Sequence, residues 1–223
     1  MGQGDVGTVT HVCRVAQLRP DRGTVGVTAI DKRPVDGPVR VGRYGLRGDV
    51  QADRKDHGGL EKAVYAYDQA EADHWAGELG EDVPAGRFGE NLRVSGLRVD
   101  DAEIGERWRI GESLELEVTG PRTPCATFGR WLGQDGWVRR FTGRGRPGAY
   151  LSVLTPGEVC AGDSITVTHR PGHGITVAGW FARPSAGDAR TLLEAEADGA
   201  TVLARYLREH VLRAASRAAV PAP

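Results

Sequence analysis

Alternating hydrophobic and polar positions predict short strands along much of the chain. Between residues 114 and 119, two leucines and a valine alternate with two glutamates and a threonine, which is the period of a half-buried strand. Gly120-Pro121 then ends this run. Hydrophobic runs at 9–15 and 25–30 lie on either side of the turn sequence Pro20-Asp21-Arg22-Gly23, which predicts an opening β meander. Further strands are predicted at 62–67, 150–154 and 165–167.

Two segments carry the signals of helices. Asp68 and Glu71 have the spacing of an acidic capping box, which predicts a helix that runs to residue 79 and ends at Gly80. From Ala189 to Ala219 the chain is rich in alanine, leucine, arginine and glutamate, and its hydrophobic residues lie near helical spacing. This second segment predicts two small helices close to the end of the sequence.

Composition favours a mainly β protein with some helix. The 223 residues are 39% hydrophobic and include 32 glycines and 12 prolines, which suits many short strands and turns. A formal net charge of −1 with interspersed signs opposes a nucleic-acid or membrane partner. The sequence has neither a basic leader followed by an apolar run nor an apolar stretch of about 18 residues, so a cytoplasmic protein is expected.

The segment Pro121-Arg122-Thr123-Pro124-Cys125 presents a cysteine on a stiff loop directly after the predicted strand. The two prolines fix their own φ angles and restrict the residues before them, so little backbone freedom remains near Cys125. A nucleophile or metal ligand benefits from that stiffness. The alternative is a cysteine buried as a small hydrophobic residue. Three widely separated cysteines, Cys13, Cys125 and Cys160, form neither a disulfide framework nor a CxxC zinc pattern.

Two polar loops contain further candidate site residues. His57-Gly58-Gly59 places an imidazole beside backbone that lacks Cβ atoms and allows a ligand to approach closely, and Lys62 follows it. Phe88-Gly89-Glu90-Asn91-Leu92 offers a carboxylate and an amide after a glycine turn, which suits the polar edge of a ring. The plainer interpretations are a solvated loop histidine and an ordinary turn.

A basic, glycine-rich run at 139–148 predicts a phosphate-binding loop, because guanidinium groups and exposed backbone amides hold phosphate well. Its arginines are Arg139, Arg140, Arg144 and Arg146. The run matches G-x-G-x-x-G, but Pro147 interrupts it and it opens no helix of a βαβ unit, so we exclude a Rossmann site. Pro171-Gly172 prevents His169 and His173 from sharing a helical face, which favours a structural loop over a zinc site.

The order of these pieces resembles the MOSC family, which is named for the C-terminal domain of molybdenum cofactor sulfurases. The chain is similar in particular to the stand-alone bacterial branch associated with resistance to N-hydroxylated purines. The resemblance covers roughly residues 5 to 170, and a weaker similarity covers the helical tail. It rests on Gly48-Asp49, Asp53, His57-Gly58-Gly59, Lys62-Ala63-Val64-Tyr65, Gly89-Glu90-Asn91-Leu92, Pro121 to Cys125, Gly148-Ala149-Tyr150, Pro156-Gly157-Glu158-Val159 and Gly162-Asp163.

The resemblance implies a MOSC-type β-barrel-like domain over residues 1–170, a C-terminal helical extension over 171–223, and bound molybdenum cofactor (molybdopterin). Cys125 matches the family's loop cysteine, a molybdenum ligand or sulfur carrier. The implied pocket residues are Asp53, His57, Lys62, Glu90, Asn91 and Arg122. We add Arg144 and Arg146 as a hypothesis for the cofactor phosphate. The sequence departs from the family in Ala126-Thr127-Phe128, where an aromatic and a basic residue are expected.

Two functions follow as expectations. The first is a molybdenum-dependent oxidoreductase that reduces small N-hydroxylated compounds, in which Cys125 binds the metal and Lys62 or His57 supplies protons. A separate electron-transfer protein is then expected, since the N-terminal β domain of the eukaryotic amidoxime-reducing enzymes is not recognisable here. The second is a sulfur-carrier or cofactor-handling module in which Cys125 holds a persulfide. A nucleic-acid-binding domain is a weaker third interpretation, favoured only by the arginine run.

Overall fold

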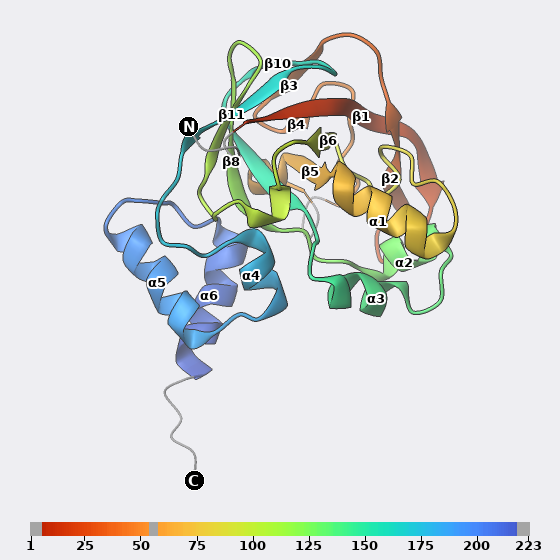
Figure 1. The fold of residues 1–223 in the computed structure, drawn as a ribbon. Helices are drawn as coiled ribbons and strands as arrows, with labels where there is room; N and C mark the ends of the chain where they lie inside the picture. The colour runs from red at the N-terminus through yellow and green to blue at the C-terminus, as the bar shows by residue number, and fades with distance from the viewer. Residues whose placement is uncertain (1–5, 54–57, 218–223) are drawn as a thin grey trace.

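The computed structural model of the protein describes residues 6–53 and 58–217, in which seven strands close into a barrel (Figure 1). These strands are β1 (Val6–Pro20), β5 (Val64–Asp68), β6 (Leu92–Ser95), β7 (Arg107–Ile110), β8 (Leu114–Pro121), β9 (Ala149–Thr155) and β11 (Ser164–His169). Their order is β11-β7-β8-β9-β5-β6-β1, and β1 closes the ring by pairing with β11. The predicted mainly β, barrel-like fold is confirmed.

The remaining strands lie outside this ring. They are β2 (Val27–Pro34), β3 (Val39–Gly42), β4 (Gly45–Leu46) and β10 (Gly157–Val159). β2 pairs with the second half of β1 and extends the sheet, which confirms the predicted opening meander. β10, β3 and β4 form a separate small sheet. All barrel neighbours are antiparallel except β5 and β6, which are parallel and are connected through a helix.

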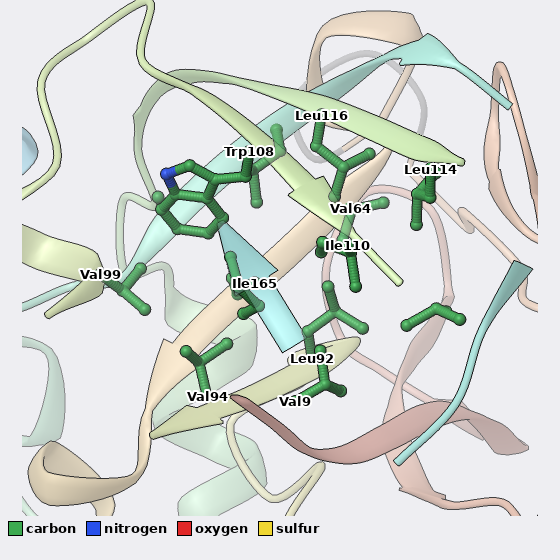
Figure 2. Close-up of a cluster of buried hydrophobic side chains, with 14 of the residues drawn as sticks. Val9, Val64, Leu92, Val94, Val99, Trp108, Ile110, Leu114, Leu116 and Ile165 are labelled. Atoms are coloured by element: carbon green, nitrogen blue, oxygen red, sulfur yellow. The ribbon is translucent and has the colours of Figure 1, made fainter. Parts of the chain in front are cut away.

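The predicted alternation in β8 builds the barrel wall. Leu114, Leu116 and Val118 are at most 1% exposed and belong to the barrel's hydrophobic core. The glutamates between them, Glu115 and Glu117, form ion pairs with arginines of the neighbouring strand β7. Period-two alternation therefore separates a packed interior from a charged outer face. Figure 2 shows part of this core, with Val9, Val64, Leu92, Val94, Val99, Trp108, Ile110, Leu114, Leu116 and Ile165 labelled.

Helix α1 (Gln69–Leu79) begins and ends where the sequence predicts. The Asp68 carboxylate accepts a hydrogen bond from the Ala70 amide, and Gly80 ends the helix with a φ of 67°, in the left-handed region that glycine favours. The capping-box role predicted for Glu71 is wrong. Its carboxylate instead accepts hydrogen bonds from Arg98 and Arg144. These two arginines hold the Glu71 carboxylate, so the side-chain cap of the helix comes from Asp68 alone.

A second core, the aromatic cluster, lies between the barrel and three helices. It contains Ile30, Tyr65, Tyr67, Ala72, Trp75, Val83, Phe88, Phe128, Leu132, Trp137, Phe141 and Tyr150. Helix α2 (Ala126–Leu132) contributes Phe128, and α3 (Trp137–Arg144) contributes Trp137 and Phe141. The Phe128 and Phe141 rings meet edge to face with centroids 5.1 Å apart. This packing fixes the start of α2, the position that follows Cys125.

The prediction of a loop at the start of the 139–148 arginine run is wrong. Residues 137–144 form α3, and Gly145 ends it with a φ of 70°. Trp137 and Phe141 lie four residues apart, so both point into the aromatic cluster from one face of the helix. Burial of these two rings outweighs the weak helix propensity of the glycine at position 143.

The chain after residue 170 forms three helices on one side of the barrel (Figure 1). They are α4 (Val177–Ala182), α5 (Ala186–Ala197) and α6 (Arg205–Arg217). The last two were predicted, whereas α4 is short and is capped by Thr176. The helices share their own hydrophobic cluster, which includes Ile104 from the barrel side.

The division of the chain into two parts at residue 170 stays a prediction. Within the described parts of the chain, the helices are all too short or too polar to cross a membrane.

Candidate functional site

One cavity brings together most of the residues predicted to form a site. The Cys125 cavity has a volume of about 340 Å³ and is lined by residues from 21–32, 49–53, 62–65, 88–91, 122–130 and Tyr150. The predicted residues in its lining are Asp53, Lys62, Asn91, Arg122 and Cys125. A thiol, an ammonium, a guanidinium and a carboxylate therefore surround one space, although they come from distant parts of the sequence.

Cys125 occupies the N-cap position of α2, immediately after the proline-braced loop that follows β8. Its backbone is extended, with φ −128° and ψ 171°, and its carbonyl accepts the hydrogen bond from the Gly129 amide. The side chain is half-buried and packs against the aromatic cluster. The helix and the cluster thus hold the sulfur in place at the cavity wall, as the stiffness of the loop sequence predicts.

Arg122 places a buried positive charge in the same wall. Its side chain is 5% exposed, and its guanidinium carbon lies 3.9 Å from the centroid of the Phe128 ring. Among the described residues, its Nη1 has no hydrogen-bond partner. Burial raises the pKa of the neighbouring Tyr150, and the Arg122 charge opposes that rise. A buried donor of this kind is stabilised when an acceptor enters the cavity.

Lys62 ends the short helix η1 (Leu60–Lys62) just before β5. Its Nζ lies 4.2 Å from the ring centroid of Tyr206 and 5.5 Å from that of Tyr150. The ammonium group therefore lies against two aromatic rings at the cavity edge. Gln51 fixes the chain leading into η1, because its side-chain amide accepts a hydrogen bond from the Gly59 amide at 2.8 Å.

Asn91 is anchored by three groups, all from residues that sequence analysis did not assign to the site. Its Oδ1 accepts from the Tyr65 amide, while its Nδ2 donates to the Cys13 carbonyl and to Asp49 Oδ2 at 2.8 Å. Asp49 Oδ2 also pairs with Lys32 Nζ at 2.7 Å. This network positions the cavity floor, and both Asp49 and Lys32 contribute to the lining.

Lysine usage is a signal that identifies part of this site from the sequence. The chain contains three lysines, Lys32, Lys55 and Lys62, against a much larger number of arginines. Lys32 and Lys62 both line the Cys125 cavity, and Lys55 lies outside the described residues. Where arginine is the default cation, a lysine indicates a position that needs a compact ammonium group.

Glu90 lies next to the cavity but does not contribute to its lining. The side chain is fully buried, and its carboxylate accepts hydrogen bonds from the Gly86 and Phe88 amides at 2.7 and 3.0 Å. The same carboxylate pairs with the buried Arg93. Glu90 therefore closes the 86–90 turn from the inside, and its predicted part in cofactor binding finds no support in this geometry.

Arg144 and Arg146 do not contribute to the lining of the Cys125 cavity. Arg144 pairs with Glu71 through two hydrogen bonds, and Arg146 pairs with Asp101. Both guanidinium groups thus neutralise carboxylates near η2 (Val99–Asp101) instead of forming a phosphate loop beside Cys125. His57 lies outside the described residues, so its assignment stays a prediction.

A wider, open cleft of about 1170 Å³ lies along the small sheet. Its lining includes the β3–β4 turn and residues 156–160, with Cys160 among them. It contains none of the predicted site residues that the structure describes. Size alone would favour this cleft, but the chemistry that the sequence identifies lies in the smaller cavity, which we take as the candidate site.

The fold is that of a MOSC domain, and comparison with known proteins agrees. The MOSC domain profile matches residues 53–166. The chain is 34% identical to the uncharacterized protein YflK of Bacillus subtilis over 192 residues, which cover 86% of this chain and 82% of YflK. The chain belongs to the MOSC family.

Other relatives cover less of their own length. YiiM of Escherichia coli is 34% identical over 146 residues, or 64% of this chain and 65% of YiiM. A Gibberella moniliformis protein named reductase is 33% identical over 162 residues. This alignment covers 69% of the present chain but only 28% of the reductase. The match to the reductase is therefore a match to one part of a larger protein.

Solved structures support the fold. YiiM from Geobacillus stearothermophilus superposes with a TM-score of 0.73 at 23% identity, covering 93% of this chain and 98% of that one. YiiM from Escherichia coli gives 0.70 at 22% identity, covering 92% and 91%. Since these alignments cover more than nine tenths of the chain, they include most of the helical extension as well as the barrel.

Proposed function

We propose that this protein binds molybdenum cofactor in the Cys125 cavity and reduces N-hydroxylated compounds with it. The observation that carries the proposal is that Cys125 and the buried Arg122 line one cavity, and that Arg122 Nη1 has no hydrogen-bond partner among the described residues. Membership of the MOSC family supports the cofactor. The printed name of one relative, reductase, supports the class of reaction.

The residues present fit such a cofactor. A thiol is a soft ligand, and coordination to a metal removes its proton outright. The Arg122 guanidinium offers hydrogen-bond donors to phosphate or to ring oxygens, and the volume of about 340 Å³ lies within the range of roughly 300–1,000 Å³ seen for small-molecule sites. Cys125 and Arg122 would therefore hold the group, with Asp53 and Asn91 beside it.

The remaining residues prepare the reaction. Reduction of an N-hydroxyl group to the amine consumes two electrons and two protons and releases one water molecule. When bound, the cofactor supplies the two-electron transfer. Lys62 holds a proton at Nζ beside the cavity and delivers it to the departing hydroxyl, while the aromatic wall excludes bulk water. Electrons come from a separate electron-transfer protein in this proposal.

Elemental analysis tests the cofactor site. Protein produced in a cofactor-synthesising host is expected to contain about one molybdenum per chain, and Cys125→Ala is expected to lose it. Cys160→Ala is the matched control, because Cys160 is also half-buried but lines the open cleft. Metal loss in Cys160→Ala with retention in Cys125→Ala would overturn the choice of ligand.

Activity is tested separately on the loaded protein. With a competent electron donor, a hydroxylaminopurine or an amidoxime is expected to be reduced to the amine. Failure on both substrates would overturn the reductase assignment and leave the cofactor site standing. A sulfur adduct on Cys125 in native mass spectra, without molybdenum, would favour the sulfur-carrier function instead.

A further inference from the structure

Helix α6 meets the segment that carries Lys62 through two adjacent pairs of residues. The Glu61 carboxylate accepts a hydrogen bond from the Arg205 amide at 2.7 Å. The following residues of the two segments, Lys62 and Tyr206, are also in contact, because Lys62 Nζ lies 4.2 Å from the ring centroid of Tyr206. Residues 61 and 62 are thus held by residues 205 and 206, which belong to the C-terminal helical extension.

The local backbone allows this close approach. Gly120 in β8 has a φ of 147°, and a Cβ there would lie 2.9 Å from the Tyr206 hydroxyl oxygen. Next to it, the Thr119 hydroxyl lies 3.3 Å from the Tyr206 hydroxyl and donates to the Glu61 carbonyl at 2.6 Å. The tyrosine ring is therefore fixed at its far end while its face is presented to Lys62.

The arrangement suits an ammonium group. The negative face of an aromatic ring attracts a cation, and the attraction grows as water is excluded. Burial raises the pKa of Tyr206, so its hydroxyl stays neutral and keeps its hydrogen bond at neutral pH. A lysine side chain has several rotatable bonds, and two flanking rings restrict where its Nζ can lie.

We propose that Tyr206 is a positioning residue, through which the helical extension holds the Lys62 ammonium at the edge of the Cys125 cavity. The extension then completes the site. The consequence for catalysis rests on the proposed function, but the positioning itself does not. A purely structural role is the competing explanation, because Tyr206 also packs against the hydrophobic cluster of the extension.

Selective labelling of lysine tests the contact directly. With three lysines in the chain, 13C-lysine gives three sets of signals. The set that disappears in Lys62→Arg belongs to Lys62. Aromatic ring currents displace nearby nuclei upfield, so the Lys62 ε-methylene is expected upfield of its position in a free chain. Tyr206→Leu is expected to remove that displacement, and Tyr206→Phe, which keeps the ring, is expected to retain most of it.

Leu203→Ala controls for a loosened helix, since Leu203 is buried in the hydrophobic cluster of the extension and lies just before α6. Thermal unfolding of all variants shows whether each folds. An unchanged Lys62 signal in Tyr206→Leu would overturn the proposal. Equal loss of the displacement in Leu203→Ala, or in Tyr206→Phe, would also overturn it, because the ring would then not be the positioning group.

Kinetics add a second readout. If the protein reduces N-hydroxylated compounds, Tyr206→Leu is expected to lower kcat about tenfold with little change in KM, and Tyr206→Phe is expected to restore it. An equal loss in both variants would overturn the role of the ring in catalysis. Absence of reductase activity in the wild type would contradict the proposed function alone, because the NMR result does not depend on turnover.

Discussion

Asp21 binds Arg130 through both carboxylate oxygens, and this pair joins the β1–β2 turn to the helix that follows Cys125. The Asp21 oxygens accept from Arg130 Nε and Nη2 at 2.8 and 2.7 Å, and Thr127 donates to Oδ2 at 2.9 Å. Hydrogen bonding from Arg130 holds the pKa of Asp21 well below its usual range, so the pair stays charged at neutral pH. Both residues line the cavity, and the pair therefore closes one side of it.

Removing this pair is expected to open the cavity with little effect on stability. Asp21→Asn keeps the shape of the side chain but loses the charge, so the turn is held less firmly against α2. Arg130 is 39% exposed, and exposed ion pairs contribute little to stability. Alkylation of Cys125, followed by mass spectrometry, is expected to become several-fold faster. Glu115→Gln breaks an exposed pair on β8 and is expected to leave that rate unchanged; an unchanged rate in Asp21→Asn would contradict the closing role.

The three cysteines are expected to differ sharply in reactivity. Burial, with the charge of Glu90 as a smaller cause, raises the pKa of Cys13 to about 12. At pH 8 only about one Cys13 in 10⁴ is then a thiolate, and the side chain is fully buried. Iodoacetamide at pH 8 should modify Cys125 and Cys160 in the folded, cofactor-free protein and Cys13 only in urea. Peptide mapping checks this, and labelling of Cys13 as fast as Cys160 in the folded protein would contradict it.

Local signals explain what the sequence could predict. Strand β8 follows from alternation, and α1 follows from Asp68 and Gly80, because each feature involves residues within a few positions of one another. The same holds for the stiffness around Cys125. Helix α3 was missed because its glycines and arginines suggested a loop, although Trp137 and Phe141 at helical spacing carried the correct signal.

Contacts between distant residues explain what the sequence could not predict. The Asp49 carboxylate is held at the site by hydrogen bonds from Val15, Lys32 and Asn91, which only the closed barrel brings together. Glu90 was assigned to the cofactor because an acid after a glycine turn has the right chemistry. The direction of its carboxylate depends on how the 86–90 turn closes around it, and no spacing in the sequence specifies that direction.

Glu90 is therefore expected to matter for stability. Glu90→Gln leaves the charge of Arg93 buried without its partner, and breaking a buried pair in this way costs about 3–5 kcal/mol. Urea denaturation measures the loss, and the exposed pair of Arg109 and Glu115 is the control, with an expected change below about 1 kcal/mol in Glu115→Gln. If Glu90→Gln lost molybdenum at unchanged stability, the sequence-based role in cofactor binding would be correct instead.

Asp100 gives the protein a pH-dependent stability that a single substitution should remove. The side chain is buried and its Oδ1 accepts a hydrogen bond from the Gly148 amide at 2.8 Å. Burial is the main cause that raises the pKa of Asp100 to about 7. The nearby carboxylates of Glu71 and Asp68 add to the rise, while the Gly148 hydrogen bond and the Arg146 charge oppose it. The folded protein therefore keeps a proton on Asp100 that the unfolded chain releases near pH 4.

The sign of the effect follows from that difference. Between about pH 4 and pH 7 the folded state binds more protons than the unfolded state, so the contribution of Asp100 to stability falls as pH rises and levels off above pH 7. Asp100→Asn keeps an acceptor for Gly148 and cannot ionise. Its melting temperature relative to the wild type is expected to increase from pH 4 to pH 8, by roughly 2–4 °C for each kcal/mol of unfolding free energy that the wild type loses through Asp100. A difference in melting temperature that stays constant across this range would show that Asp100 ionises normally in the folded protein.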